Sequence, residues 1–233
     1  FLLELIGELE ANGFEVPYSN TDGLVSKVPR GQIDLYYRIC KGWMDKYKFN
    51  LEYEKFEKMI LKDVNNFLFV TEKGKLKKKG SFVTEISLKT GFEYPVVPLA
   101  VEQYLINHIP VEHTVTNHTD IYDYCISQKS DDKFKNEFHQ IVNGEYKVSD
   151  VQKTLRYFVS TDGGSLFKVP KSLEIEREKS RQSTFQLELV PKDLKPKKKV
   201  TERIAYEQGS KVTLFNDYFE GDYKVNYQYY INE

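Results

Sequence analysis

Residues 13–30 read GFEVPYSNTDGLVSKVPR, and this stretch decides how the N-terminal part of the chain folds. Two short apolar runs flank the turn signal Asn-Thr-Asp-Gly, in which Asn20 and Gly23 tolerate a positive φ. This pattern predicts a β-hairpin over residues 14–28. Because Pro17 has no N–H to donate to a neighbouring strand, its side of the hairpin is expected at a sheet edge or a bulge.

The segments on either side of the hairpin predict two helices and further strands. Residues 1–12 and 31–47 repeat apolar side chains at helical intervals, and Gly13 is a natural stop for the first helix. The apolar stripe of this helix is expected to comprise Leu2, Leu3, Ile6 and Leu9. We expect an α+β fold in which the hairpin joins strands from 51–60 and 65–83 in one antiparallel, palm-type sheet, with both helices covering one face.

The composition changes along the chain, and three regions are expected. Residues 1–93 contain the sheet and its covering helices. Residues 94–150 form an acidic, helical region whose helices begin near Pro95 and Pro110, since proline fits a first helical turn. Residues 151–233 alternate strand-like runs with polar connections, and their Tyr-rich end is expected to carry one more helix.

Composition and charge limit the classes of protein that the sequence can encode. The net charge is −1 although 30% of the residues are charged, so nucleic-acid binding has to depend on local clusters. No apolar run approaches the roughly 18 residues of a membrane span, so no membrane partner is expected. Cys40 and Cys125 show neither metal-binding spacing nor a disulfide framework, which indicates a reducing, cytoplasmic setting.

Candidate chemistry is concentrated in the first region, where acidic residues are followed by a lysine cluster. Asp22 lies in the hairpin turn, and strand alternation predicts that Glu52 and Glu54 point to the same side. The lysine cluster comprises Lys75, Lys77, Lys78 and Lys79. Mg²⁺ prefers hard oxygens together with substrate phosphates, and lysines bind the backbone of nucleic acids. This order of residues favours a site that handles a phosphodiester.

Each of these signals also has an ordinary structural explanation. Asn-Thr-Asp-Gly is a common hairpin turn, and lysines on an exposed strand edge discourage aggregation. The Tyr-rich C-terminal segment suits either base stacking or a protein core. Gly163-Gly164 is expected to form a hairpin turn. A second lysine-rich stretch is a loop or linker that contributes to DNA binding through Lys195, Lys197, Lys198 and Lys199.

Three motifs, taken in order, resemble those of family B DNA polymerases of the phage and prophage branch. YSNTDGL at 18–24 is similar to the motif Tyr-x-Asp-Thr-Asp-Ser, and LEYEK at 51–55 is similar to the Leu-Glu-Phe-Glu-Lys segment that follows it. KLKKKGSF at 75–82 stands where the family has Lys-x-Tyr. The segments LAVEQYLINHIPVEHTV and DDKFKNEFH also resemble that branch, so the likeness covers most of residues 1–140.

The resemblance implies the C-terminal part of a DNA polymerase palm, followed by a thumb-like region at 94–150. Asp22 corresponds to the second Asp of the motif, which helps to coordinate two magnesium ions in the family. Asn20 stands at the position of the first Asp and offers an amide oxygen without a charge. Glu52 or Glu54 is implied as a peripheral acid near the metals, and the lysine cluster as a contact to primer-end phosphates.

The family takes its other essential carboxylate and its nucleotide-gripping helix from upstream segments, which are not present here. The resemblance therefore implies half of an active site, inactive alone and completed by a missing N-terminal polymerase half. The implied partners are primer–template DNA and a deoxynucleoside triphosphate, and the implied location is the cytoplasm of a bacterial host. Two other interpretations stay open: a noncatalytic DNA-binding module derived from a polymerase, and a phage structural or interaction protein.

Overall fold

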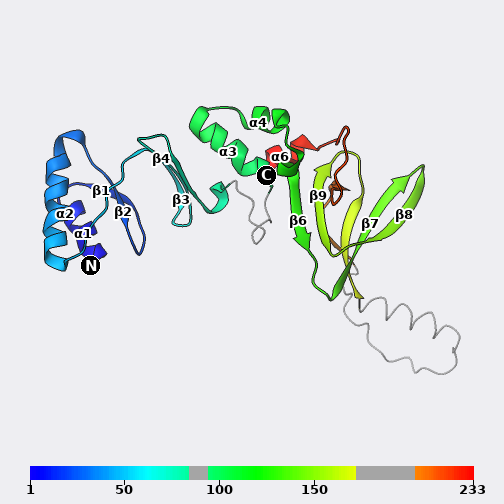
Figure 1. Cartoon of the computed structure of the whole chain (residues 1–233), viewed down its shortest axis with the longest axis horizontal. Coiled ribbons are helices and arrows are strands. Elements are labelled where there is room, and N and C mark those ends of the chain that lie inside the picture. Colours follow the sequence, from blue (N-terminus) through cyan, green and yellow to red (C-terminus); the bar gives the residue numbers. More distant parts are fainter. Residues whose placement is uncertain (84–93, 172–202) are drawn as a thin grey trace, which may run out of the picture. The chain divides into compact units, whose positions relative to one another are not determined.

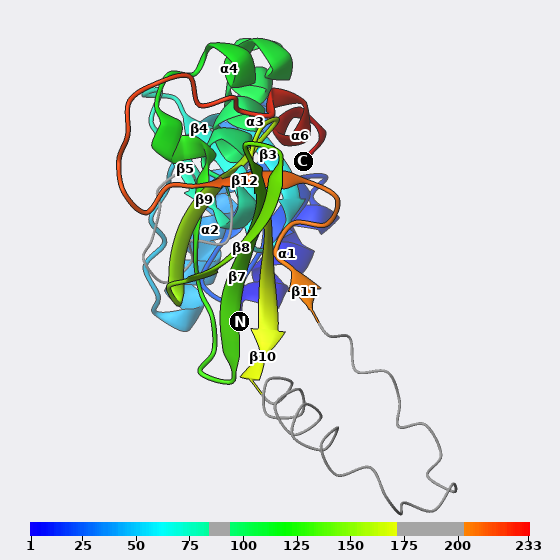
Figure 2. The same cartoon turned by 90° about the vertical axis from the view of Figure 1, so that its right-hand side faces the viewer.

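A computed structural model of the chain describes residues 1–83, 94–171 and 203–233 (Figures 1 and 2). The chain divides into two compact units, Phe1–Val83 (unit 1) and Thr84–Glu233 (unit 2). Each unit has its own hydrophobic core. All strand pairs described are antiparallel and are accompanied by helices, which confirms the α+β class. Within the described ranges, no helix has both the length and the apolar character needed to cross a membrane.

The first half of unit 1 follows the sequence prediction. Its elements are α1 (Leu2–Ala11), β1 (Glu15–Ser19), β2 (Leu24–Lys27), the 3-10 turn η1 (Arg30–Gln32) and α2 (Ile33–Tyr47). Gly13 follows α1 with a φ of 85°, a left-handed conformation that glycine adopts without strain. The register of the hairpin shifts between Glu15 and Tyr18, so Pro17 lies at an irregularity in the ladder, as predicted.

The core of this half lies between the two helices and the hairpin, and α1 is rotated from its predicted orientation. Leu5 and Leu9 are buried in the core, and Leu2 packs against it. Leu3 is 82% exposed, so its predicted place on the apolar stripe was wrong. The reason is geometric: Leu3 precedes Leu9 by six residues and lies about 120° around the helix from it, whereas Leu2 and Leu5 lie on its face.

The second half of unit 1 is a sheet of its own. Its elements are β3 (Phe56–Asp63), β4 (Asn66–Thr71), β5 (Leu76–Lys79) and the 3-10 turn η2 (Gly80–Phe82). The strand order is β3-β4-β5, and the hairpin β1-β2 forms a separate two-stranded sheet. The prediction of one continuous sheet was therefore wrong.

The segment before β3 explains why the two sheets remain separate. The N–H of Leu51 donates to Sδ of Met44 at 3.3 Å, and the Leu51 side chain packs against the core of the helices. The chain is thus held beside α2 and enters the sheet only at Phe56. The two sheets meet through Tyr18, whose ring centroid lies 5.7 Å from that of Phe67 and 5.9 Å from that of Phe69.

Unit 2 begins with helices and continues with strands. Its helices are α3 (Val96–Asn107), α4 (Val111–Asn117), the 3-10 turn η3 (Ile121–Tyr124) and α6 (Tyr227–Asn232). Its strands are β6 (Cys125–Lys129), β7 (Phe134–Val142), β8 (Glu145–Val151), β9 (Thr154–Ser160), β10 (Ser165–Pro170), β11 (Ile204–Ala205) and β12 (Lys211–Leu214). Helices α3 and α4 start directly after Pro95 and Pro110, as predicted, and α6 is the predicted C-terminal helix.

The strands of unit 2 form two sheets, with the orders β11-β10-β7-β8 and β12-β9-β6. Strands β6 and β7 come from the region 94–150, which was expected to be helical, and they pair with β9 and β10 from the region 151–233. The helical character of the middle region therefore ends at Tyr124, because the strands after it are needed to complete both sheets.

The glycine pair 163–164 connects these two sheets, so the predicted hairpin turn was wrong. The pair follows β9, which belongs to one sheet, and precedes β10, which belongs to the other. A Cβ added to Gly164 would lie 2.4 Å from the carbonyl oxygen of His139, and one added to Gly163 would lie 2.3 Å from that of Val212. Glycine is required here because two strands approach its backbone closely.

Candidate functional site

The Asn-Thr-Asp-Gly turn is braced by the side chain of Asn20. Its Oδ1 accepts the N–H of Asp22 at 2.9 Å and the N–H of Gly23 at 2.8 Å. Its Nδ2 donates to the hydroxyl oxygen of Tyr18 at 3.2 Å, and its own N–H donates to the carbonyl of Gly23 at 2.9 Å. Because the amide oxygen already accepts two hydrogen bonds, Asn20 acts on the turn itself and is poorly suited to a metal ion.

Asp22 is exposed at the tip of this turn, with its backbone held by Asn20. Among the residues that the structure describes, no three His, Cys, Asp or Glu side chains are grouped to hold a metal ion. Two-metal chemistry needs carboxylates from separate strands. The described part of the chain thus offers Asp22 as one potential ligand.

Glu52 and Glu54 lie in the irregular segment before β3, and both are exposed. The alternation of a strand therefore does not apply to them, and it does not predict that their side chains point to the same side. Glu54 instead forms an ion pair with Lys77 of β5. This pair places one acidic side chain against the lysine cluster.

Three lysines of the cluster, Lys77, Lys78 and Lys79, lie on β5, which pairs with β4. Lys77 is opposite Phe69 and Lys79 is opposite Phe67, and residues directly opposite in an antiparallel pair point to the same face. This is the face that Tyr18 contacts. Lys78, opposite Leu68, points to the other face.

The structure therefore brings the hairpin turn and part of the lysine cluster to one face of the β3-β4-β5 sheet. Tyr18, which accepts a hydrogen bond from Asn20, also donates to the carbonyl of Val64 at 3.4 Å. Val64 lies between β3 and β4, at the end of the sheet where Lys79 pairs. Lys75 precedes β5 and is exposed. The second lysine cluster, at Lys195, Lys197, Lys198 and Lys199, lies outside the described residues.

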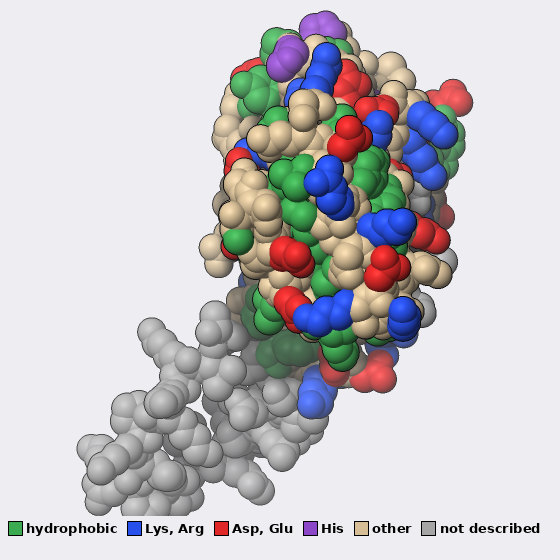
Figure 3. All heavy atoms as spheres, turned by 90° about the vertical axis from the view of Figure 1, so that its left-hand side faces the viewer, with side chains coloured by type: hydrophobic (Ala, Val, Ile, Leu, Met, Phe, Trp, Pro, Cys, Tyr) green, Lys and Arg blue, Asp and Glu red, His purple; other side chains and the backbone are tan. Residues whose placement is uncertain are grey.

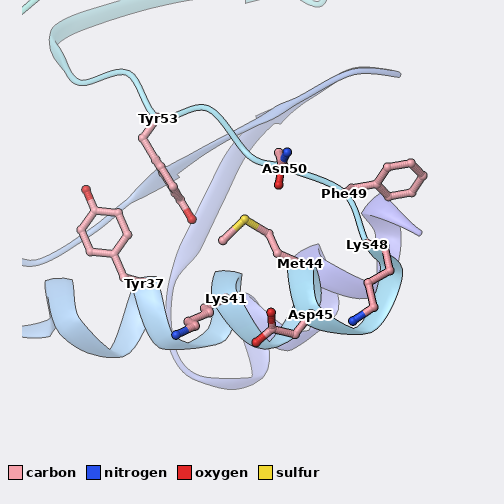
Figure 4. A pocket seen from close by; sticks show the side chains of 8 residues that line it. All are labelled: Tyr37, Lys41, Met44, Asp45, Lys48, Phe49, Asn50 and Tyr53. Carbon is pink, nitrogen blue, oxygen red and sulfur yellow. The ribbon is translucent and has the colours of Figure 1, made fainter.

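A pocket of about 520 Å³ lies between α2 and the segment that runs back along it (Figure 4). Its lining consists of Tyr37, Lys41, Met44, Asp45, Lys48, Phe49, Asn50 and Tyr53. The rings of Tyr37 and Tyr53 meet edge to face, with centroids 4.9 Å apart. The size is typical of small-molecule sites, and sequence reasoning missed it because this segment was expected to be a strand.

The two cysteines are buried, which does not favour thiolate chemistry. Burial raises the pKa of Cys125 to about 12, and burial also raises the pKa of Cys40. A thiol with a raised pKa is mostly protonated near neutral pH and reacts slowly as a nucleophile.

Unit 2 contains two hydrogen-bonded clusters that the sequence analysis did not identify. In the first, the hydroxyls of Tyr94, Tyr157 and Tyr229 all donate to the Glu207 carboxylate. No local sequence signal predicts this cluster, because its members come from distant segments. The second joins Glu137, His139 and Tyr146 on β7 and β8. Here the spacing Glu-x-His in a strand was a usable signal, since it places both side chains on one face.

The surface shows no region dominated by charges of one sign on the face drawn in Figure 3, where basic and acidic side chains are interspersed with apolar ones. This distribution agrees with the net charge of −1.

No protein-family model, curated protein or solved structure matches this chain. The resemblance to family B DNA polymerases stays a prediction from the sequence motifs.

Proposed function

We propose that unit 1 binds the phosphate backbone of DNA as the C-terminal part of a polymerase palm, in a phage-type enzyme acting in a bacterial cytoplasm. The observation that carries this proposal is the shared sheet face: Lys77 and Lys79 point to the face that Tyr18 joins to the Asp22 turn. A carboxylate and cations on one surface suit a substrate that carries both a reacting phosphate and a charged backbone.

The residues on this face have separable roles. Lys79 and Lys77 neutralise backbone phosphates, and Glu54, paired with Lys77, lowers the net positive charge at that end of β5. Asn20 holds the turn so that Asp22 projects from its tip. Bound magnesium would supply the charge that activates a hydroxyl nucleophile and stabilises the transferred phosphoryl group. Asp22 would be one of its ligands, with the others provided by an N-terminal polymerase segment.

The DNA-binding part is tested by the salt dependence of affinity for a short duplex. Replacing Lys77 and Lys79 with Ala should reduce the slope of log K against log salt by about two, at roughly one unit per lost phosphate contact. The matched control replaces Lys27 and Lys46, two lysines of the same unit that form ion pairs with Glu15 and Glu4. An equal change in both double variants would show that only net charge matters and would reject this face as the DNA site.

The catalytic part is tested by adding the N-terminal, nucleotide-binding part of a family B polymerase palm. The chain alone should incorporate no nucleotide, whereas the reconstituted enzyme should polymerise, and Asp22→Asn should abolish that activity because phosphoryl transfer depends on metal charge and position. Asn20→Asp should leave activity within about tenfold, a barrier change near 1.4 kcal/mol, since Asn20 braces the turn. Full activity of the reconstituted Asp22→Asn enzyme would reject the metal-ligand role.

A noncatalytic DNA-binding module is the second candidate. The observation that favours it is the use of the Asn20 amide oxygen in the turn, which leaves Asp22 as the one carboxylate of the motif. This candidate shares the expected loss of salt dependence in the Lys77 and Lys79 variant. It differs in predicting that reconstitution yields no polymerisation, with or without Asp22.

A further inference from the structure

A hydrogen-bonded chain of three side chains runs from the surface of unit 2 into its interior. The hydroxyl of Tyr146 is hydrogen-bonded to Nδ1 of His139, and Nε2 of His139 lies 3.1 Å from Oε2 of Glu137. Tyr146 is 66% exposed, whereas His139 and Glu137 are 4% and 5% exposed. An accessible phenol is thus backed by a buried imidazole and a buried carboxylate.

The register of β7 and β8 fixes this arrangement. Glu137 and His139 are two residues apart on β7 and therefore share a face. His139 pairs with Val148 and Ile141 pairs with Tyr146, so Tyr146 is the diagonal neighbour of His139 on the same face. Diagonal neighbours in an antiparallel pair lie within reach of aromatic side chains.

The surroundings of Glu137 set the direction of the hydrogen bonds. Burial raises the pKa of Glu137, but hydrogen bonds from His139 and Lys135 outweigh it and hold this pKa below its ordinary value. Nζ of Lys135 lies 3.2 Å from Oε1, and Nε of Arg203 lies 3.6 Å from Oε2. An ionised carboxylate accepts the Nε2–H of the imidazole, and in this tautomer Nδ1 is the acceptor for the hydroxyl of Tyr146.

We propose that Tyr146 is an acyl-accepting nucleophile, with His139 as its general base and Glu137 as the group that orients the imidazole. The phenol oxygen attacks the carbonyl carbon of an activated ester or thioester, and its proton passes to Nδ1 of His139. A C–O bond to Tyr146 forms, the bond to the leaving group breaks, and the leaving group departs as an anion. The imidazolium is stabilised by Glu137 and then loses its proton to solvent.

The chemistry of the donor follows from the side chains around the phenol. Ile141, directly opposite Tyr146, and Val148, opposite His139, are both exposed on this face. They offer apolar surface to an acyl chain next to the nucleophile. The nearby cations Lys135 and Arg203 are engaged with Glu137, which makes a phosphoryl donor a poorer fit. This inference is independent of the proposed function, because all of its residues belong to unit 2.

The test uses p-nitrophenyl acetate with the full chain, following release of p-nitrophenolate and mapping acetylated tyrosines by mass spectrometry. Tyr218 is an internal control: it is 59% exposed, and its hydroxyl donates to a carboxylate, that of Glu220, at 3.3 Å. Tyr146 should react at least tenfold faster than Tyr218 in the folded protein, since a positioned base contributes about 10²–10⁴-fold. In urea the two tyrosines should react equally. Equal reactivity in the folded protein would overturn the proposal.

Variants separate general-base activation from simple exposure. Tyr146→Phe should remove the fast phase of release, and His139→Gln should reduce the rate at Tyr146 to that at Tyr218. Because His139 is buried, circular dichroism first checks that each variant folds like the parent chain. The comparison of Tyr146 with Tyr218 in the parent chain tests the proposal even if a variant does not fold. Retention of the fast rate in a folded His139→Gln variant would reject the role of the imidazole.

The pH dependence gives a readout that a structural role would not change. The groups facing His139 among the described residues are Glu137 and Tyr146, with Lys135, Asp150 and Arg203 around Glu137. With a positioned base taking the proton of the phenol, the rate at Tyr146 should rise less steeply with pH than the rate at Tyr218. The rate at Tyr218 should rise about tenfold per pH unit with its phenolate. A tenfold rise per unit at Tyr146 as well would overturn the proposal.

Discussion

The two units of the chain use aromatic side chains in different ways. In unit 1, several tyrosines lie at the edges of small cores: Tyr37 and Tyr53 line an open pocket, and Tyr18 joins two sheets. In unit 2, tyrosines are part of the core itself. Tyr157 and Tyr230 are almost completely buried, and their hydroxyls are hydrogen-bonded to Glu207 and to the carbonyl of Tyr124.

The two units differ in how many tyrosine hydroxyls are buried and need a hydrogen-bond partner within the protein. A buried phenol needs a hydrogen-bond partner, and unit 2 supplies partners from segments far apart in the sequence. The hydroxyl of Tyr94 reaches Glu207 at 2.8 Å, across 113 positions of the chain. The Tyr-rich C-terminal segment therefore contributes Tyr229 and Tyr230 to this network, and the interpretation of that segment as core is confirmed for Tyr230.

The largest expected difference between the units is their response to alkaline pH. Burial raises the pKa values of Tyr94, Tyr124, Tyr157 and Tyr230 above the ordinary value of 10.0. Their contribution to stability is complete below pH 10 and is lost as pH rises further, because the unfolded chain ionises first. Four such groups should reduce the stability of unit 2 by about 5 kcal/mol per pH unit above 10.

Two spectroscopic signals follow the units separately in this experiment. The chain has a single tryptophan, Trp43, which lies in the core of unit 1. Urea unfolding followed by Trp43 fluorescence reports unit 1, and tyrosine circular dichroism reports mainly unit 2. Unit 1 should lose stability less steeply, since burial raises the pKa of only two of its tyrosines, Tyr36 and Tyr53, and neither side chain is fully buried. Equal slopes for both signals would contradict the comparison.

A cavity in the core of unit 1 tests whether the units unfold independently. Leu9→Ala removes a fully buried side chain and should reduce the stability of unit 1 by about 2–5 kcal/mol, measured by Trp43 fluorescence in urea. Leu3→Ala, in the same helix but at an exposed position, should change it by about 0.5 kcal/mol or less. The tyrosine signal of unit 2 should be unchanged in both variants. A parallel shift of that signal in Leu9→Ala would show that the two cores are coupled.

In unit 2, the carboxylate of Glu207 is the position at which a single substitution tests stability. Glu207→Ala leaves the hydroxyls of Tyr94, Tyr157 and Tyr229 without their acceptor and should reduce the stability of unit 2 by about 1–3 kcal/mol. Glu207→Gln keeps an amide oxygen and should recover part of the loss. Urea unfolding followed by tyrosine circular dichroism measures the stability of both variants. Equal stability of Glu207→Ala and the parent chain would show that the cluster adds no stability.

Local patterns made unit 1 largely predictable. The helix ends and the hairpin depend on residues close in sequence, and both were expected. The errors arose where a tertiary contact outweighs the local pattern. Leu51 is held beside α2 by Met44, which delays β3 and removes the strand alternation assumed for Glu52 and Glu54.

In unit 2, the prediction reached the helix starts at Pro95 and Pro110 but not the sheets. Strand β7 pairs with β8, which is local, and with β10, which is not. Sequence spacing predicts the first kind of pairing and contains little information on the second. The same limit applies to the site residues: Glu-x-His was readable, whereas the position of Tyr146 beside it depends on the register of a hairpin.

The smallest expected effect concerns the hairpin turn of unit 1, and it distinguishes a brace from a metal ligand. Asn20→Ala removes the acceptor of the Asp22 and Gly23 N–H groups and should reduce the stability of unit 1 by about 1 kcal/mol, comparable to the loss of a helix cap. Asn20→Asp keeps a side-chain oxygen in the same place and loses only the donation from Nδ2 to Tyr18, so the change should be about 0.5 kcal/mol. Magnesium at millimolar concentration should not alter either value in the chain alone, because one carboxylate at an exposed turn binds the ion weakly. Stabilisation of Asn20→Asp by magnesium, absent in the parent chain and read from the Trp43 transition, would instead show that position 20 lies where a second metal ligand can act.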